Sequence, residues 1–453
     1  MTTTATPLAH RLVDASLAVR ADALPAAIVD KVRVCLQDAI GCACETHDLP
    51  WSRQARTLAR PLAGDGATVI GEAGAWAPGD AAFANAVMAH GLVREDMHAG
   101  SISHLGIVVV PTLLALAETR PVTGADLVAA MVVGYEVGGA LGRALLDADR
   151  ARIHRPTGVT GPLAAAAAGA RLLGLDAAAC VSALGLAANA CAGFNQWAHT
   201  GGSEMFFHAG NAARNAVAAV ELAAAGAYAS PDALDGEAGL GAALGKREAL
   251  AGVAPFADGY EIAQVYHKAV PACNYAQTPA LAALEIARDA APDANAIESI
   301  EVRITDAALR YPGCDARGPY RHALQGKMSI QYTVAVALAS GALEEASYAR
   351  LDDPLLANLV GRTTLVVDAA LSAAYPARQG AEVIVTTRDG QRHRARLDDV
   401  LHATPALVTA RCRAALAARF DDARAATVMD VVDAIERRPD AAALPHALRA
   451  SPP

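Results

Sequence analysis

Residues 93–104 bring acids, a guanidinium and imidazoles together between two apolar runs. The members of this first cluster are Arg94, Glu95, Asp96, His98 and His104, and His90 lies just upstream. Carboxylates and imidazoles can take up and return protons, and a guanidinium can hold an anion, so the set suits proton transfer on a carboxylate substrate. A solvated, charge-rich loop is the alternative interpretation. Four more polar clusters, also set among apolar or alanine-rich segments, follow along the chain and favour the functional interpretation.

The second cluster covers residues 152–161, where two glycines and two threonines precede an alanine-rich run. Free backbone N–H groups at the start of a helix favour bound anions. Arg155 could add a bidentate contact to a carboxylate, with His154 and Thr157 beside it. An ordinary capped helix with a plain loop is an equally good interpretation.

The third cluster, residues 195–211, is a dense polar segment between two apolar helices. We expect His208 to stand immediately before a helix over residues 211–225. There the positive end of the helix dipole would favour the neutral imidazole, which is a competent base. A surface loop with Asn211 as the helix cap is the competing interpretation.

The fourth cluster, residues 266–277, falls at a predicted domain boundary, where clefts usually form. Lys268 could neutralise a carboxylate there, or it could be a solvated lysine on a linker. Cys273 has no identifiable helper, so a small buried thiol is favoured over a nucleophile.

The fifth cluster, residues 321–332, surrounds a predicted helix start at Ser329, a residue type that caps helices. Lys327 and Tyr332 would flank this start. The Tyr332 hydroxyl could donate a proton, or the ring could be a core-edge aromatic with its hydroxyl satisfied.

Composition limits the classes of protein to consider. The 453-residue chain is long enough for a large core and two domains, and 53% of its residues are hydrophobic but only 4% aromatic. The formal net charge of −9, with no basic stripe, argues against nucleic-acid binding.

The eight cysteines are scattered, which predicts reduced thiols and no zinc site. No secretory signal or membrane-spanning run is evident, so we expect a cytoplasmic protein without a membrane partner.

The spacing of apolar residues predicts helices almost throughout residues 8–263. These helices carry few polar residues on any face, which indicates that they are buried inside a large helical body. The pattern then changes. Residues 299–305 alternate as a half-buried strand, residues 363–367 are β-branched, and residues 381–397 predict a hairpin with a two-residue turn at Asp389-Gly390. We therefore predict a mainly α protein with a large helical domain (1–265), a smaller α+β domain (266–398) and C-terminal helices (399–453) that pack back on the first domain.

Taken in order, the five clusters resemble the MmgE/PrpD family. That family includes 2-methylcitrate dehydratases, cis-aconitate decarboxylases and iminodisuccinate epimerases, and the likeness covers nearly the whole chain. It rests on Glu95-Asp96 with His104, on Pro156-Thr157-Gly158 through Gly161, on His208-Ala209-Gly210, on Lys268 with Pro271, and on Lys327-Met328-Ser329 with Tyr332.

The resemblance implies a large all-helical domain, a smaller α+β lid, a homodimer, and an active site between the two domains that uses neither a metal nor an organic cofactor. The candidate proton carriers are then Asp96, His104 and His208, with Tyr332 as a donor. The candidate substrate-binding residues are Glu95, His98, His154, Arg155, Thr157, Lys268, Gln277 and Lys327.

Several positions differ from the family's usual pattern. Arg155 stands where a histidine is common, Met205 where a lysine is common, and Gln277 where a histidine is common. Residues 93–97 lack one acid and the threonine of the Asp-Phe-Asp-Asp-Thr run that the family often has. These differences indicate a divergent member with another substrate.

The chemistry that the family shares is formation of a carbanion next to a carboxylate. The resemblance therefore predicts a cofactor-independent lyase, of hydro-lyase type, acting on a small di- or tricarboxylate such as a 2-methylcitrate- or aconitate-like acid. Loss of CO2 would instead make it a decarboxylase. An epimerase of a related, iminodisuccinate-like diacid and a catalytically silent, carboxylate-binding member are the alternatives.

Overall fold

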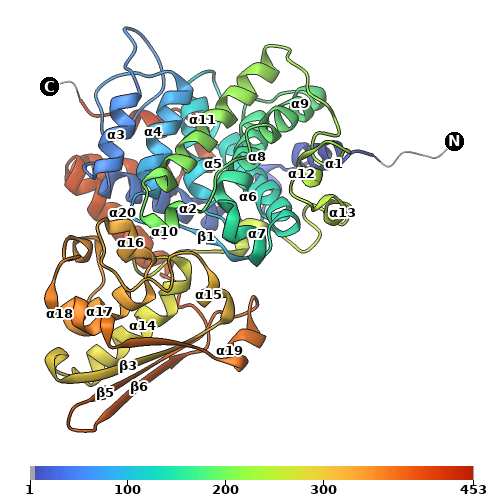
Figure 1. The fold of residues 1–453 in the computed structure, drawn as a ribbon. Coiled ribbons are helices and arrows are strands. Elements are labelled where there is room, and N and C mark those ends of the chain that lie inside the picture. The colour runs from blue at the N-terminus through green and yellow to red at the C-terminus, as the bar shows by residue number, and fades with distance from the viewer. Residues whose placement is uncertain (1–5, 452–453) are drawn as a thin grey trace.

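The computed structural model describes residues 6–451, which form a helical body and a smaller part built on a sheet (Figure 1). The helical body comprises residues 8–264 and 405–451, and the sheet-bearing part comprises residues 270–400. Helices dominate both parts, so the predicted mainly α class is confirmed.

The first half of the helical body is a succession of helices joined by short loops. They are α1 (Leu8–Leu17), α2 (Ala26–Glu45), α3 (Pro50–Leu58), α4 (Pro78–His90), α5 (Gly106–Ala117), α6 (Gly124–Leu145), α7 (Ala148–Ile153), α8 (Pro156–Leu172), α9 (Ala177–Ala188), α10 (Trp197–Thr200) and α11 (Glu204–Ala224). Two short 3-10 turns, η1 (Ala21–Ala23) and η2 (Ala99–Ser101), lie between them.

Small residues let the central helices of the body pack closely around α6. A Cβ added at Gly138 would lie 2.7 Å from Leu105 and 2.8 Å from Ala164, so only glycine allows this approach of α5 and α8. The α6 helix is long and apolar enough to cross a membrane, but 89% of its most apolar window is buried inside the protein. A buried core helix can be as long and as apolar as a membrane-spanning helix, so these two properties alone are weak evidence for a membrane span.

The prediction of nearly continuous helix up to residue 263 is wrong after α11. Residues 226–264 are mostly loop and turn, with only α12 (Leu240–Ala243), α13 (Arg247–Leu250) and η3 (Glu261–Gln264). Seven glycines from residue 226 to residue 259 interrupt the segment, and Gly226, Gly245 and Gly259 adopt positive φ angles that end or bend local structure.

The sheet-bearing part holds four strands in the order β4-β3-β5-β6. Strand β3 (Ile297–Ile304) runs parallel to β4 (Thr363–Val367) and antiparallel to β5 (Ala381–Thr387), which pairs with β6 (Arg392–Leu397). Its helices are α14 (Asn274–Asp289), α15 (Asp306–Arg310), α16 (Ala323–Met328), α17 (Ile330–Ser340), α18 (Pro354–Gly361) and α19 (Ala369–Ala374), with η4 (Ala294–Ala296) and η5 (Glu345–Ala349). Helices α14, α16 and α17 lie between the sheet and the helical body (Figure 1).

The predicted hairpin is present, but its turn is longer than predicted. The Thr387 amide donates to the Gln391 carbonyl at 3.0 Å, which leaves three residues, 388–390, in the loop. Gly390 has a φ of 84°, so the glycine supplies the left-handed position that a three-residue loop requires.

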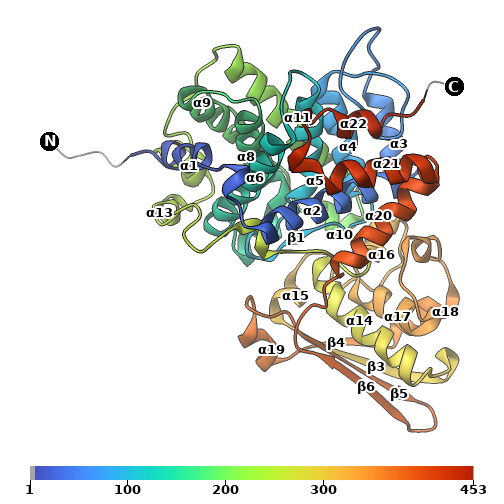
Figure 2. The ribbon, with the colours of Figure 1, turned by 180° about the vertical axis from the view of Figure 1, so that it is seen from behind.

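The C-terminal helices lie along the helical body on the face shown in Figure 2. They are α20 (Pro405–Arg419), α21 (Asp422–Asp433), η6 (Ile435–Arg437) and α22 (Ala443–Ala447), and α20 packs against α2. A Cβ at Gly41 would lie 2.9 Å from the Cα of Cys412, so glycine permits this contact. The Arg411 guanidinium also donates to the Ala269 carbonyl at 2.6 Å, which connects α20 to the loop after β2.

A very short sheet connects the first and fourth polar clusters, and the sequence did not indicate it. Strand β1 (Met97–His98) pairs antiparallel with β2 (Val265–Tyr266), with Met97 opposite Tyr266. This pairing brings residues 94–104 beside the loop that carries Lys268. It therefore assembles one site from segments far apart in the chain.

Candidate active site

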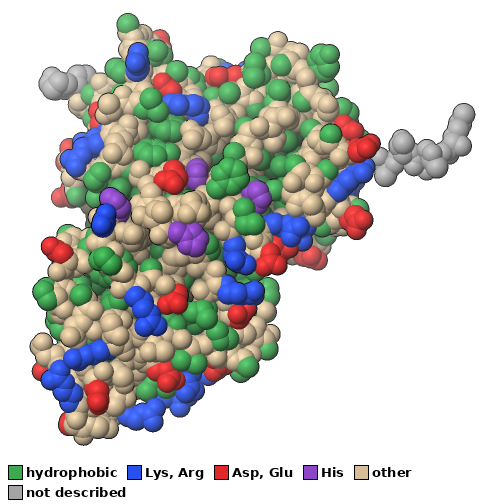
Figure 3. All heavy atoms as spheres, in the orientation of Figure 1, with side chains coloured by type: hydrophobic (Ala, Val, Ile, Leu, Met, Phe, Trp, Pro, Cys, Tyr) green, Lys and Arg blue, Asp and Glu red, His purple; other side chains and the backbone are tan. Residues whose placement is uncertain are grey.

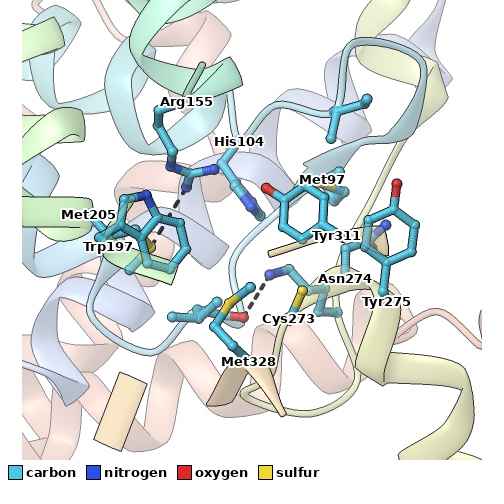
Figure 4. Close-up of a pocket in the computed structure, with 13 residues that line it drawn as sticks. Met97, His104, Arg155, Trp197, Met205, Cys273, Asn274, Tyr275, Tyr311 and Met328 are labelled. Carbon is cyan, nitrogen blue, oxygen red and sulfur yellow. Dashed lines mark hydrogen bonds between the residues drawn. The ribbon is translucent and has the colours of Figure 1, made fainter. Parts of the chain in front are cut away.

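A small cavity of about 30 Å³ lies where the helical body meets the sheet-bearing part. Both parts contribute to its wall (Figure 4). Its polar lining residues are His104, Arg155, Lys268, Cys273, Asn274 and Tyr311, and apolar side chains such as Met97, Trp197, Met205 and Met328 complete the wall. Histidine side chains also gather on the surface along this junction (Figure 3).

Four buried side chains are connected in a chain on one side of the cavity by two hydrogen bonds and a close contact between Glu95 and His104. Arg155 Nη2 lies 2.8 Å from His90 Nε2, and His90 Nδ1 lies 2.6 Å from Glu95 Oε1. His104 Nδ1 lies 2.8 Å from the Asp96 carbonyl oxygen and 3.3 Å from the same Glu95 Oε1. The chain therefore runs from the guanidinium to the imidazole that lines the cavity.

These contacts determine which ring nitrogens carry hydrogen. A guanidinium only donates, so His90 Nε2 must accept from Arg155 and His90 Nδ1 must carry the proton given to Glu95. The neighbours of His104 Nδ1 are also acceptors, so this nitrogen carries hydrogen as well. In neutral His104 the free lone pair is therefore on Nε2, the remaining ring nitrogen of a side chain that points into the cavity (Figure 4).

Burial keeps both imidazoles neutral. It lowers the pKa of His104 well below the usual value, and the nearby Lys268 ammonium lowers it further. Burial likewise lowers the pKa of His90. For Glu95, burial alone would raise the pKa, but the interactions with His90 and Lys268 more than offset it and hold the carboxyl ionised. A neutral imidazole in a cavity with two cations is suited to accept a proton.

Arg155 is placed by the first turn of α8, for which it is the N-cap residue before Pro156. Its guanidinium lies over the Trp197 ring, 5.7 Å from the ring centroid, and its side chain is 4% exposed. Arg155 Nε has no hydrogen-bond partner within residues 6–451. A buried cation with an unused donor at a cavity wall is an anion-binding arrangement.

Lys268 supplies the second cation of the cavity. Its Nζ donates to the Val93 carbonyl at 2.6 Å and lies 3.4 Å from the Ala272 carbonyl, and no carboxylate is directly paired with it within the described chain. Burial lowers its pKa, and the Glu95 carboxylate counters this shift. The ammonium therefore retains capacity to bind an anionic group from the cavity.

Lys327 lies close by but does not line the cavity. Its Nζ donates to the Leu92 carbonyl at 2.9 Å and forms a salt bridge with Glu345. Together with Lys268 it binds the carbonyls that follow the end of α4, and Val93 there has a φ of 59°, which is unusual for a β-branched residue. We predicted that Lys327 binds a substrate carboxylate. In the structure it instead binds backbone carbonyls of the segment between His90 and Glu95.

Asp96 points away from the cavity into the helical body. Its Oδ2 accepts from the Tyr135 hydroxyl at 2.5 Å and its Oδ1 from the Gly106 amide at the start of α5. Burial raises the pKa of Asp96 to about 6, and the neighbouring Asp38 carboxylate adds to the shift. We predicted that Asp96 carries a proton. In the structure its side chain binds the start of α5, and its backbone carbonyl contacts His104.

The helix that follows the third cluster begins earlier than predicted. Helix α11 starts at Glu204, so His208 lies inside it and not before its first turn. Met205 and Phe206 are buried and continue the apolar spacing toward the N-terminus of the helix, which explains the earlier start. Burial lowers the pKa of His208 to about 4, with further lowering by Arg155 and His90. The imidazole is neutral, as predicted, but burial is the cause, and the ring does not line the cavity.

The second cluster is also helical from Pro156, so the predicted loop before the alanine-rich helix is wrong. A Cβ at Gly158 would lie 2.1 Å from the Ala192 carbonyl oxygen, so a backbone contact requires this glycine. Thr157 Oγ1 accepts from the His104 amide at 3.1 Å and so positions that residue. His154 contacts Phe194, with ring centroids 6.0 Å apart, outside the cavity.

Three further predicted residues support loops around the cavity. Gln277 Nε2 donates to the Val270 carbonyl at 2.9 Å and shapes the segment after Lys268. Tyr332 donates to the Ser347 carbonyl at 2.9 Å, and Ser329 caps α17 as predicted. His98 lies 2.8 Å from Glu261 in the helical body. None of these three side chains lines the cavity.

Some cavity residues were not predicted. Asn274 and Tyr275 lie at the start of α14, and Tyr311 follows α15 without a polar cluster around it. Cys273 lies at the wall, with its sulfur 3.8 Å from that of Cys314, and both are free thiols. Within residues 6–451, no group of three or more His, Cys, Asp or Glu side chains is arranged to hold a metal ion.

Comparison with known proteins shows the family to which this chain belongs. The MmgE/PrpD N-terminal domain profile matches residues 10–251, and the C-terminal domain profile matches residues 270–436. A cis-aconitate decarboxylase-like protein, oryM, of Aspergillus oryzae is 32% identical over 209 residues, which is 44% of this chain and 43% of that protein. A cis-aconitate decarboxylase of Aspergillus terreus is 29% identical over 201 residues, 43% of this chain and 41% of that protein. The matched segments thus span less than half the length of these relatives.

Proposed function

Because this chain belongs to the MmgE/PrpD family, we propose that it is a lyase that forms a carbanion next to a carboxylate of a small polycarboxylic acid. The observation that carries the proposal is the cavity itself, where neutral His104 lies beside Arg155 and Lys268. Relatives described as cis-aconitate decarboxylase and its like support an unsaturated or hydroxylated diacid or triacid as substrate.

In the proposed reaction, Arg155 and Lys268 hold carboxylate groups of the substrate. His104 Nε2 exchanges a proton with the carbon next to one of them, and the cations stabilise the negative charge that develops. For dehydration, His104 Nε2 removes the proton, the C–O bond to the β-hydroxyl breaks, and the imidazolium returns that proton to the departing hydroxyl, which leaves as water. For decarboxylation, His104 Nε2 first takes up a proton from solvent; CO2 then leaves, and the carbanion takes that proton from the imidazolium. General acid–base catalysis of this kind contributes about 10²–10⁴-fold to the rate.

The cavity must widen before it can hold such an acid. A volume of about 30 Å³ has space for little more than a water molecule or two. Lys268, Cys273 and Tyr311 come from the sheet-bearing part or its connection, while His104 and Arg155 belong to the helical body. We therefore propose that the sheet-bearing part acts as a lid that moves to admit the substrate.

An epimerase is less well supported. Epimerisation needs proton carriers on opposite faces of one carbon, and His104 is the one imidazole among the residues lining the cavity in the described chain. Removal and return of the proton on a single face, or loss of a group, suits this arrangement better.

The test is turnover in D2O followed by NMR with citrate-like, aconitate-like and succinate-like acids. Loss of water or CO2 with deuterium incorporation is expected for at least one acid with two or more carboxylates. Deuterium exchange with stereochemical inversion and no elimination would support the epimerase instead. Neither exchange nor elimination with any acid of the panel would overturn the proposed activity and favour a silent, carboxylate-binding protein.

A further inference from the structure

A second, larger cavity adjoins the candidate active site. It has a volume of about 170 Å³ and shares Met97, Ile102, Asn274 and Tyr275 with the lining of the first cavity. The rim includes the exposed residues Ala99, Gln264, Ala377 and His402. We call this cavity the vestibule, because it leads from solvent to the wall behind which His104 lies.

The vestibule differs from the inner cavity in charge. The inner cavity has Arg155 and Lys268 at its wall, whereas no lysine or arginine lines the vestibule and Asp399 contributes a carboxylate. Lys31 and His267 lie outside the lining but near His402, where they add to the effect of burial in lowering the pKa of that imidazole. An anionic group in the vestibule would therefore be less favoured than one beside Arg155 and Lys268 in the inner cavity.

The polar atoms on the vestibule wall are mostly paired with one another. The Tyr275 and Tyr375 hydroxyl oxygens are 2.8 Å apart, and the Asn274 side-chain amide donates to Gln379 at 2.9 Å. The Tyr266 ring stacks on His402, with ring centroids 4.4 Å apart. The surface left for a ligand is therefore mixed, with the faces and edges of aromatic and apolar side chains beside polar groups that are mostly uncharged.

Resting on the function proposed above, we infer that the vestibule binds an uncharged, apolar or aromatic tail of the substrate, while Arg155 and Lys268 bind its two carboxylates. The volume supports this inference, because cavities of about 150 Å³ accept a benzene-sized group. The two inner cations match at most two carboxylates, so a third carboxylate would lie in the vestibule beside Asp399. The substrate class is thus a substituted diacid and not a tricarboxylate.

The test uses calorimetric binding of three probes, methylsuccinate, benzylsuccinate and tricarballylate. They share a succinate core and carry a methyl, an aromatic or a carboxylate-bearing tail. We expect benzylsuccinate to bind at least tenfold more tightly than either of the others. Equal or tighter binding of tricarballylate would overturn the inference.

Two matched variants test the location of the tail. Ala377→Trp fills the vestibule rim and should reduce benzylsuccinate affinity to within a factor of two of methylsuccinate affinity. Ala373→Trp changes an exposed alanine of α19 that does not line the vestibule, and should preserve the preference. If Ala377→Trp does not fold, Ala99→Trp blocks the opposite rim. An unchanged preference in the folded rim variant would contradict the inference.

The two proposals fail in different ways. If methylsuccinate binds and the aromatic tail adds nothing, the vestibule inference is wrong while the proposed function stands. If none of the three acids binds, the proposed function is wrong, and the inference about the vestibule is wrong as well because it depends on that function.

Discussion

At the scale of single residues, the contact between Arg155 and His90 controls the chemistry available at His104. Because the guanidinium can only donate, it orients His90 so that Nδ1 donates to Glu95, whose carboxylate also lies 3.3 Å from His104 Nδ1. A histidine at position 155, which is common in the family, would not impose this direction. The arginine therefore adds both a cation to the cavity and a defined hydrogen-bond pattern behind it.

The first prediction concerns Arg155 as a carboxylate ligand. Arg155→Gln should weaken binding of methylsuccinate about 10- to 100-fold, the range expected when one charge-assisted hydrogen-bonding group is removed. Isothermal calorimetry measures the affinity directly. Arg152→Gln, at an exposed position three residues earlier, is the control and should bind like the wild type. Equal affinities in all three proteins would remove Arg155 from the site.

The second prediction concerns pH. Burial and the Lys268 ammonium lower the pKa of His104 below 6.5, so the base stays neutral as the solution is acidified and the acid limb of kcat/KM should lie below pH 6.5. In Lys268→Met the cation is gone, so the pKa of His104 rises and the limb should move to higher pH. A limb above pH 6.5 in the wild type, or a shift to lower pH in the variant, would contradict this assignment.

At the scale of secondary-structure elements, the segment after α4 is positioned by parts of the chain that follow it much later. Lys268 and Lys327 bind three successive carbonyls, those of Gly91, Leu92 and Val93. Cations near the carbonyls at the end of a helix are favourable. This arrangement holds the turn in which His90 and Glu95 face one another.

The third prediction tests Lys327 as a support. Lys327→Met should lower the free energy of unfolding by about 3 kcal/mol, because it breaks a buried pair and leaves Glu345 and two carbonyls without their donor. Urea denaturation gives the value. Arg288→Met, which removes a fully exposed pair with Asp289, should change stability far less than Lys327→Met does. Comparable losses in the two variants would refute the special role of Lys327.

The fourth prediction concerns the start of α5. A Cβ at Gly106 would lie 2.5 Å from the Tyr135 hydroxyl and 2.6 Å from Asp96 Oδ2, so Gly106→Ala should cost about 1–3 kcal/mol in stability through overpacking. Thermal or chemical denaturation measures the loss. Gly361→Ala has open space around the added methyl group and should be close to neutral. A neutral Gly106→Ala would show that Asp96 does not hold α5 tightly.

Periodicity predicted the elements well where a long apolar face is repeated, as in α2, α6 and α17, and where a turn sequence joins two strands, as in β5 and β6. Periodicity failed where tertiary contacts determine which residues form an element. The β1–β2 pair is two residues long on each side and joins distant segments, so no local pattern could indicate it. The early starts of α8 and α11 were missed because polar clusters were taken as loops, although their side chains pack inside helices.

At the scale of the whole molecule, the polar clusters predicted from the sequence lie around one junction but perform different tasks. His104, Arg155 and Lys268 line the cavity, whereas Asp96, Thr157 and Gln277 position the segments that carry them. Residue type alone could not separate these groups, because both need buried polar side chains. The separation depends on which atoms face the cavity, and packing of the two parts decides that.

The fifth prediction concerns opening of the junction. A cavity of about 30 Å³ is too small for a diacid, and the proposed lid would admit the ligand by moving the sheet-bearing part and then closing over it. A saturating diacid should slow amide hydrogen exchange in residues 91–93 and 268–275 and leave α5 unchanged. Unchanged exchange in both segments, with binding verified by calorimetry, would contradict lid closure.

The most direct test of the account is solvent deuterium exchange into a bound acid at the carbon next to its carboxylate. In D2O, with an acid that the wild type turns over, the wild-type protein should catalyse this exchange. His104→Gln, verified as folded, should reduce the rate at least about 100-fold, the lower end of what a positioned general base contributes. Exchange by the His104→Gln variant within a factor of two of the wild type would show that His104 is not the base.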